Sequence, residues 1–159
     1  MGLNDEEKIL YLRRSYSAVD GLWFMMVEEE SEFEKALEID NKIWAVMPKI
    51  QARFLKKALR VDRGLDALIT CFSDKLLLDG FQFETERDET SFTIKIRNCP
   101  WHETMVKSGR EQWSLTIGNT ICSTEYAGWI KEFGPGITYE MSGRICAGDK
   151  GCEIRFTQS

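Results

Sequence analysis

Four of the five cysteines in this chain lie in its C-terminal half, where the pattern of expected strands and helices could bring them to one point. They are Cys99, Cys122, Cys146 and Cys152, and the single histidine, His102, follows Cys99 by three residues. A thiolate is both a soft metal ligand and a nucleophile, so we expect chemistry first at this set. The spacings match neither a standard zinc finger nor a ferredoxin motif.

The first interpretation of these four cysteines is a metal site. Cys146 and Cys152 flank a short loop between two expected strands, and Cys99 directly follows a strand that could be their neighbour. Zinc is the first choice because thiolate-rich sites suit it, and an iron–sulfur cluster on four thiolates is the alternative. The competing interpretation is that reduced cysteines are small buried apolar residues. That is the interpretation we adopt for Cys71, which stands next to Phe72 on an expected helix.

Cys99 and His102 are also the candidates for catalysis. If Cys99-Pro100-Trp101-His102 begins a helix, side chains three residues apart share one face, and a thiolate–imidazole pair is a working nucleophile. His102 could equally serve as a metal ligand, or be a histidine at the end of an element with no chemical role.

A second group of residues could bind a ligand. Asp20 and Trp23 lie on the first expected helix, and Asp40 and Trp44 lie on the second, where carboxylates border aromatic side chains. Such an edge could hold a cationic or polar group, although a solvated helix flank is the simpler explanation of each carboxylate. Gly21 in mid-helix costs about 1 kcal/mol relative to alanine, and a close helix crossing or a ligand would explain it.

The elements that must position these residues follow from the hydrophobic periodicity. Asn4 and Glu7 predict the capped start of a first helix, and Ser31 and Glu34 predict the start of a second. The second helix is expected to continue to about Ala58 with a kink at Pro48, antiparallel to the first. A third helix is expected over about 64–77 and a fourth over about 120–133.

Period-two alternation predicts two β-hairpins in the second half of the chain. The first spans 81–96, and the second pairs 138–146 with 152–157. The fold class is therefore α+β, with an antiparallel sheet of two hairpins packed against a long N-terminal helical hairpin and further helices. We expect a single domain over 1–159, with a helical part at 1–78 and the sheet with one helix at 79–159.

Composition limits the partners and the compartment. The formal net charge is −5 and the pI about 5.1, which favours neither nucleic acid nor an anionic membrane as a partner. The N-terminus lacks a secretory pattern, so a cytoplasmic protein with reduced cysteines is expected. The apolar run from Trp23 to Val27 exceeds what one face of a helix needs, which predicts a homodimer.

Several segments resemble a family of small prokaryotic cytosolic proteins of unestablished activity, related to L-2-amino-thiazoline-4-carboxylic acid hydrolase-like proteins and, more distantly, to the vinyl-4-reductase domain. The segments are Asp20-Gly21-Leu22-Trp23-Phe24, Ala36-Leu37-Glu38-Ile39-Asp40 with Ile43-Trp44, Cys99-Pro100-Trp101, and Gly151-Cys152-Glu153. The first relatives imply opening of a small sulfur–nitrogen ring. The second imply an α/β ligand-binding module, often dimeric, with cysteines near its C-terminal hairpin. Trp101 joins the candidate ligand-binding residues on this basis.

The residues and the resemblance together favour a small-molecule-binding or sensing domain with a cysteine metal site. The alternative is a hydrolase acting on a small sulfur/nitrogen heterocycle or an amide through Cys99 or a bound metal. A third possibility is an interaction module whose cysteines are part of its core.

Overall fold

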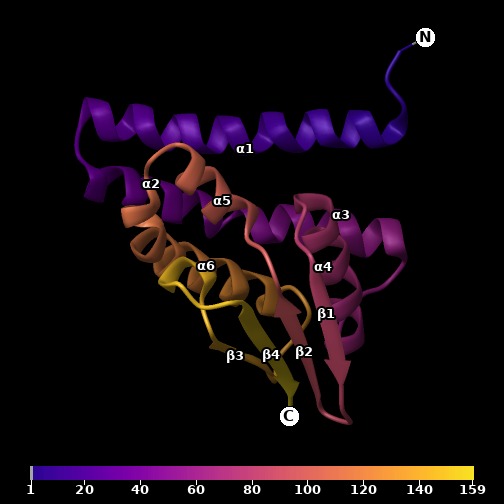
Figure 1. Ribbon diagram of the computed structural model, residues 1–159. Helices are drawn as coiled ribbons and strands as arrows, with labels where there is room; N and C mark the ends of the chain where they lie inside the picture. The colour runs from indigo at the N-terminus through magenta and orange to yellow at the C-terminus, as the bar shows by residue number, and fades with distance from the viewer. Residues whose placement is uncertain (1) are drawn as a thin grey trace. The chain divides into compact units, whose positions relative to one another are not determined.

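The computed structural model describes residues 2–159 and their helices and strands (Figure 1). The chain divides after Lys42 into two compact units. The first unit contains the N-terminal helical hairpin. The second contains the sheet, the remaining helices and all five cysteines.

The first unit begins with α1 (Asp5–Glu30), and its start confirms the predicted cap. The Asn4 side chain accepts a hydrogen bond from the Glu7 amide at 2.9 Å, and the Glu7 carboxylate accepts one from the Asn4 amide at 2.8 Å. The chain then turns at Ser31 into α2 (Phe33–Trp44), and the rings of Phe24 and Phe33 meet edge to face at 5.6 Å. Although α1 has 26 residues, no helix within 2–159 is long and apolar enough to cross a membrane.

The predicted second helix is in fact two helices, which corrects the kink expected at Pro48. Helix α2 ends at Trp44, and α3 (Met47–Leu59) begins after a short turn. Pro48 stands in the first turn of α3, where its missing N–H is no loss because that group has no partner inside a helix. Arg60 ends α3 in the left-handed conformation with φ 57°, and α4 (Leu65–Asp79) follows, close to its predicted bounds.

The sheet is antiparallel and contains both predicted hairpins. Its strands are β1 (Phe83–Arg87), β2 (Ser91–Ile96), β3 (Ile137–Ser142) and β4 (Cys152–Gln158), in the order β1-β2-β4-β3. Thus β4, at the C-terminal end, pairs with β2 of the first hairpin and with β3 of the second. The α+β class and the antiparallel sheet are confirmed.

Two features between the hairpins differ from the prediction. A short helix, α5 (Pro100–Lys107), follows β2, and a 3-10 turn, η1 (Glu111–Trp113), leads directly into α6 (Ser114–Lys131). Helix α6 starts about six residues before the predicted residue 120. The residues of its first turns have weak helix propensity, which hid this start in the sequence, and packing overrides that propensity in the fold. The stretch predicted to continue β3 instead leaves the sheet at Ser142 and forms the 3-10 turn η2 (Ile145–Ala147).

Helices α4 and α6 cover one face of the sheet and build the core with it. The Phe72 ring lies at the centre, edge to face with Trp129 at 5.2 Å and with Phe156 at 5.5 Å. Cys71, next to it on α4, is fully buried, which confirms its predicted place in the core.

A buried lysine joins α4 to α6 inside this core. The ammonium nitrogen of Lys75 lies 2.5 Å from Glu125 Oε1 and 3.2 Å from Asp79 Oδ2, and it also faces the rings of Phe72 and Phe81. Burial alone would lower the pKa of Lys75, but the two carboxylates outweigh it and raise that pKa. The lysine is therefore charged, and its charge compensates two carboxylates shielded from water.

Candidate functional site

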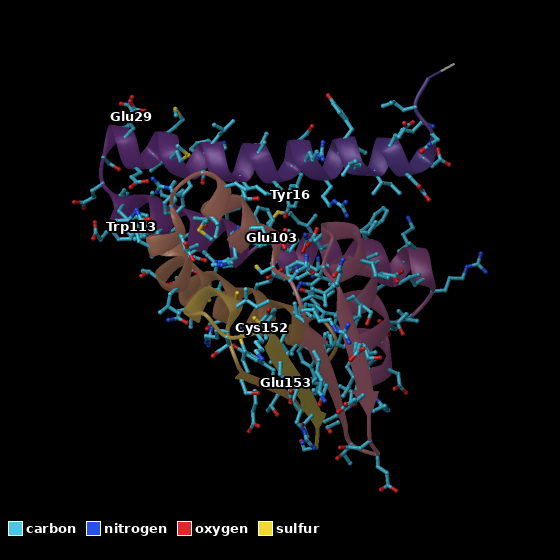
Figure 2. All side chains as sticks on the ribbon, in the orientation of Figure 1. Tyr16, Glu29, Glu103, Trp113, Cys152 and Glu153 are labelled. Atoms are coloured by element: carbon cyan, nitrogen blue, oxygen red, sulfur yellow. The ribbon has the colours of Figure 1, made fainter. Side chains whose placement is uncertain are left out.

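The four C-terminal cysteines occupy four different elements of the second unit. Cys99 is the N-cap residue of α5, three residues after the end of β2. Cys122 lies in the middle of α6, Cys146 in η2, and Cys152 at the first position of β4. Figure 2 marks Cys152 where β4 begins. The site is thus assembled from segments that the sequence separates by up to 53 residues.

Strand pairing brings Cys152 toward the segment that carries Cys99. Cys152 is the register partner of Ile96, the last residue of β2. Gly151, just before it, lies so close to β2 that a Cβ at this position would be 2.7 Å from the Ile96 carbonyl oxygen. Only glycine allows this approach, and it fixes the start of β4 against the end of β2.

A second glycine brings Cys146 onto α6. A Cβ at Gly118 would lie 3.0 Å from Cys146 Sγ, so the thiol occupies the space that a side chain would otherwise fill. Gly118 precedes Cys122 by four residues, which places both on one face of α6. Cys146 therefore sits one helical turn from Cys122.

Backbone amides point at the thiols from two of these segments. The Ile145 N–H donates to Cys152 Sγ at 3.3 Å, and the N–H groups of Trp101 and His102 at the start of α5 lower the pKa of Cys99 by donating to its sulfur. Hydrogen bonds from N–H groups favour a thiolate over a thiol.

The loop between β3 and β4 is closed by its own hydrogen bonds. The Arg144 amide donates to Asp149 Oδ2 at 2.7 Å, and the Asp149 amide donates to the Arg144 carbonyl at 3.1 Å. The Arg144 guanidinium also acts on the thiols, because its positive charge lowers the pKa of both Cys146 and Cys152.

Despite these effects, the pKa of every one of the four thiols is raised, with burial as the main cause. For Cys99 it rises to about 11, and negative charge at Cys152 and Cys146 contributes. The pKa of Cys122 rises further, through burial and then through the charges of Glu125 and of the other three cysteines. Each of these charges acts on Cys122, so the four thiols are near enough for their charges to interact.

The thiols are gathered without being arranged as ligands. Among residues 2–159, no group of three or more His, Cys, Asp or Glu side chains is arranged to hold a metal ion. All five cysteines are free thiols.

One ring nitrogen of His102 lies against a buried serine. Its Nδ1 is 2.7 Å from Ser114 Oγ, at the start of α6, and Ser114 is almost fully buried. The bond ties α5 to α6 and so helps to fix the backbone that points at Cys99. A catalytic role for Cys99 and His102 stays a prediction.

The predicted ligand-binding residues fall in both units. Trp44 and Trp101 belong to the second unit, where their rings meet edge to face at 5.8 Å. Asp20, Trp23 and Asp40 belong to the first unit, on α1 and α2. The contact between the two tryptophans connects the last residue of α2 with the segment that holds Cys99.

Two residues that shape this region, Gly118 and Arg144, were not among the site residues predicted from the sequence. Gly118 had a signal, because an isolated glycine within a helix of about 18 residues requires a packing reason. Arg144 had none, since its influence on Cys146 and Cys152 depends on the closed loop.

The raised thiol pKa values predict slow alkylation of the metal-free protein. With the pKa of Cys99 about 11 against an ordinary 9.0, its thiolate fraction near pH 7 should be about 100-fold below that of a free thiol. Iodoacetamide labelling followed by peptide mass spectrometry should show Cys99 reacting slowly and accelerating up to pH 11. The same protein in denaturant is the control. Labelling of Cys99 at the unfolded rate near pH 7 would contradict the buried placement.

The raised pKa of Cys99 also predicts how the stability of the metal-free protein changes with pH. Above pH 9.0 the unfolded chain loses thiol protons that the folded chain keeps, so the metal-free protein should lose stability as the pH rises toward 11.

Comparison with known proteins shows the fold and the family. No curated protein matches the sequence. A solved structure of similar fold is a trafficking protein particle complex subunit 3 from Naegleria fowleri, covalently bound to palmitic acid. It has a TM-score of 0.55 and 14% sequence identity, covering 98% of this chain and 97% of that one. The family of unknown function DUF6125 matches residues 5–153, and the chain therefore belongs to that family.

Proposed function

We propose that this protein is a small-molecule-binding or sensing domain whose second unit binds a metal through Cys99, Cys122, Cys146 and Cys152. The observation that supports this most strongly is the placement of the four thiols: Cys152 pairs with Ile96, three residues before Cys99, and Cys146 lies against Gly118, one helical turn before Cys122. Zinc is the first choice for the metal and an iron–sulfur cluster the alternative.

The electrostatics of the region favour a bound cation. Four ionised thiols would repel one another and Glu125, and Arg144 is a single opposing charge. Without a cation the thiols therefore keep their protons, as their raised pKa values indicate. A divalent metal would replace those protons and supply the missing positive charge, so binding should release protons and strengthen as the pH rises.

Closing the thiols around a metal requires little of the backbone. A cysteine side chain turns about one bond, and its staggered rotamers move the sulfur atom by several ångströms at small cost. The N–H groups directed at Cys99 and Cys152 would then stabilise the charge of bound thiolates. Helix α6 and the paired ends of β2 and β4 provide a rigid frame for that rotation.

The ligand-binding part of the proposal uses Trp44 and Trp101. Trp101 contacts Trp44 through its ring and Cys99 through its backbone N–H. A small molecule that displaces this ring contact would move the segment that carries one metal ligand, which is a route for sensing. Asp20, Trp23 and Asp40 remain candidate contacts in the first unit. We place the protein in the cytoplasm, where the thiols would stay reduced.

The alternative function, hydrolysis through Cys99, fits a metal-bound site better than a free nucleophile. A thiol with a pKa of about 11 is almost entirely protonated near neutral pH. A metal held by three cysteines would leave one position open for water, whereas four would favour a structural site. A hydrolase would therefore require three of the four cysteines as ligands.

Elemental analysis of protein purified without chelators and without a metal-affinity tag tests the metal proposal. We expect about one zinc per chain, or iron with acid-labile sulfide if the alternative cofactor is present. Apo protein that binds neither zinc nor iron above the level of a variant lacking the four cysteines would contradict it.

The glycine on α6 offers a test that leaves all four ligands in place. Gly118→Ala puts a Cβ 3.0 Å from Cys146 Sγ, closer than ordinary van der Waals contact, so the thiol must shift away from α6. We expect at least 10-fold weaker zinc binding, measured by competition with a chromophoric chelator, because one ligand is displaced. Gly21→Ala on α1 is the matched control, since a Cβ there meets nothing within 4 Å. Equal zinc affinity in both variants would show that Cys146 is not a ligand.

A further inference from the structure

One exposed face of α3 carries two parallel rows of side chains that the second unit does not cover. Val46, Ile50 and Phe54 form an apolar row at four-residue spacing and are 53%, 57% and 69% exposed. Lys49 and Lys57 belong to a basic row beside it, in which Arg53 also bonds to Glu132 at 3.1 Å. The opposite face of α3 packs into the second unit. We define the two rows together as the α3 face.

The charge of this segment is opposite to that of the chain. Residues 43–63 contain six basic side chains and one acidic one, although the whole chain has a net charge of −5. An exposed apolar row beside a basic row is typical of a surface that docks on something both apolar and acidic. Two α3 faces would not pair with each other, because their basic rows would repel.

The chain itself carries a surface with the complementary character. Towards the end of α1, Trp23 and Met26 are 59% and 50% exposed, and Glu29 and Glu30 continue the same face one turn later. Residues 28–34 contain five glutamates and no basic residue. Figure 2 shows the Glu29 side chain at the end of α1, directed away from the ribbon. We define this surface as the α1 end.

We propose that the α3 face binds the α1 end of a second copy of this chain. Each chain has one of each surface, so two chains offer the contact twice. Two copies of the contact bring the buried area closer to that of a stable interface than a single helix pair would. The apolar rows exclude water, and the paired charges set the partner and the register.

Charge reversal on each surface tests the proposal. One variant, Lys49→Glu with Lys57→Glu, makes the α3 face acidic. The other, Glu29→Lys with Glu30→Lys, makes the α1 end basic. Arg53 stays unchanged because it has a partner within the chain. Sedimentation at micromolar concentration should give the molecular mass of a dimer, about twice 18.4 kDa, for the wild type. Each variant alone should give the mass of a monomer, about 18.4 kDa.

An equimolar mixture of the two variants should form a heterodimer, since each contact then joins one acidic and one basic surface. A variant with all four substitutions should recover the homodimer, which also shows that the substitutions do not unfold the chain. The matched control is Lys107→Glu with Lys150→Glu, which makes the same charge change at exposed sites elsewhere and should leave the dimer intact. A monomeric wild type, or a mixture that remains monomeric, would overturn the proposal.

Discussion

Replacing Cys152 with serine should release the metal and lower the stability of the protein by about 4 kcal/mol when metal is about 1,000-fold above its dissociation constant. A serine hydroxyl is a poor ligand for a thiolate-selective metal, and bound metal stabilises only the folded chain. For a chain of this size, that loss corresponds to a fall in Tm of roughly 8–16 °C. Differential scanning calorimetry and metal analysis on the same samples measure both effects.

The matched control for this substitution is Cys71→Ala. Cys71 is the one cysteine outside the site, and it is fully buried in the core, so alanine removes a small apolar group without leaving an unpaired hydroxyl. The metal content of the Cys71→Ala variant should equal that of the wild type. In the presence of a strong chelator, Cys152→Ser and the wild type should unfold at nearly the same temperature. A full metal complement in Cys152→Ser would remove that residue from the ligand set.

Replacing Lys75 with methionine should destabilise the fold by about 3–5 kcal/mol at neutral pH. Methionine fills a similar volume, but it leaves Glu125 and Asp79 buried without the charge that compensates them. The raised pKa of Lys75 keeps it charged throughout the range in which the protein is folded, so the loss should be present at every pH at which the carboxylates are ionised. Urea unfolding followed by circular dichroism measures it.

A second variant separates the lost charge from lost packing. Adding Glu125→Gln and Asp79→Asn to Lys75→Met removes both uncompensated charges while keeping the side-chain shapes. We expect this triple variant to recover most of the stability. If Lys75→Met alone lowers the free energy of unfolding by less than about 1 kcal/mol, the ion pairs of Lys75 contribute no more than exposed ones, which would contradict the prediction.

The sequence predicted the sheet well because alternation is a local signal with an unambiguous period. Phe92, Ile94 and Ile96 on β2, and Ile154 and Phe156 on β4, alternate with polar residues, and the structure pairs Ile94 with Ile154 and Phe92 with Phe156. The capped start of α1 was predictable for the same reason, since the Asn4–Glu7 pair acts within one turn.

Helix ends that depend on tertiary packing were predicted less well. Pro48 could either kink a helix or begin one, and the sequence does not distinguish the two. A Cβ at Gly128 on α6 would lie 2.8 Å from the Pro48 ring, so that ring is held close to a helix 80 residues away in the sequence. At the start of α3, Pro48 therefore makes a tertiary contact with Gly128 that the local sequence pattern does not reveal.

The candidate site shows the same division between local and long-range information. The closeness of Cys152 to the end of β2 followed from the expected strand pairing. The place of Cys146 on α6 did not, because it depends on a turn that leaves β3 early and on the absence of a side chain at Gly118. Helical spacing places Lys75 on the same buried face of α4 as Leu68 and Phe72, but its ion-pair partner Glu125 comes from another helix and could not be predicted from this pattern.

X-ray absorption at the edge of the bound metal tests the central claim most directly, because it counts the atoms that contact the metal and identifies their element. For zinc on the four cysteines we predict a shell of four sulfur atoms at about 2.3 Å and no nitrogen or oxygen shell. The Cys152→Ser variant should show fewer sulfur atoms at whatever occupancy remains. A first shell of nitrogen and oxygen atoms in the wild-type protein would contradict the four-thiolate site.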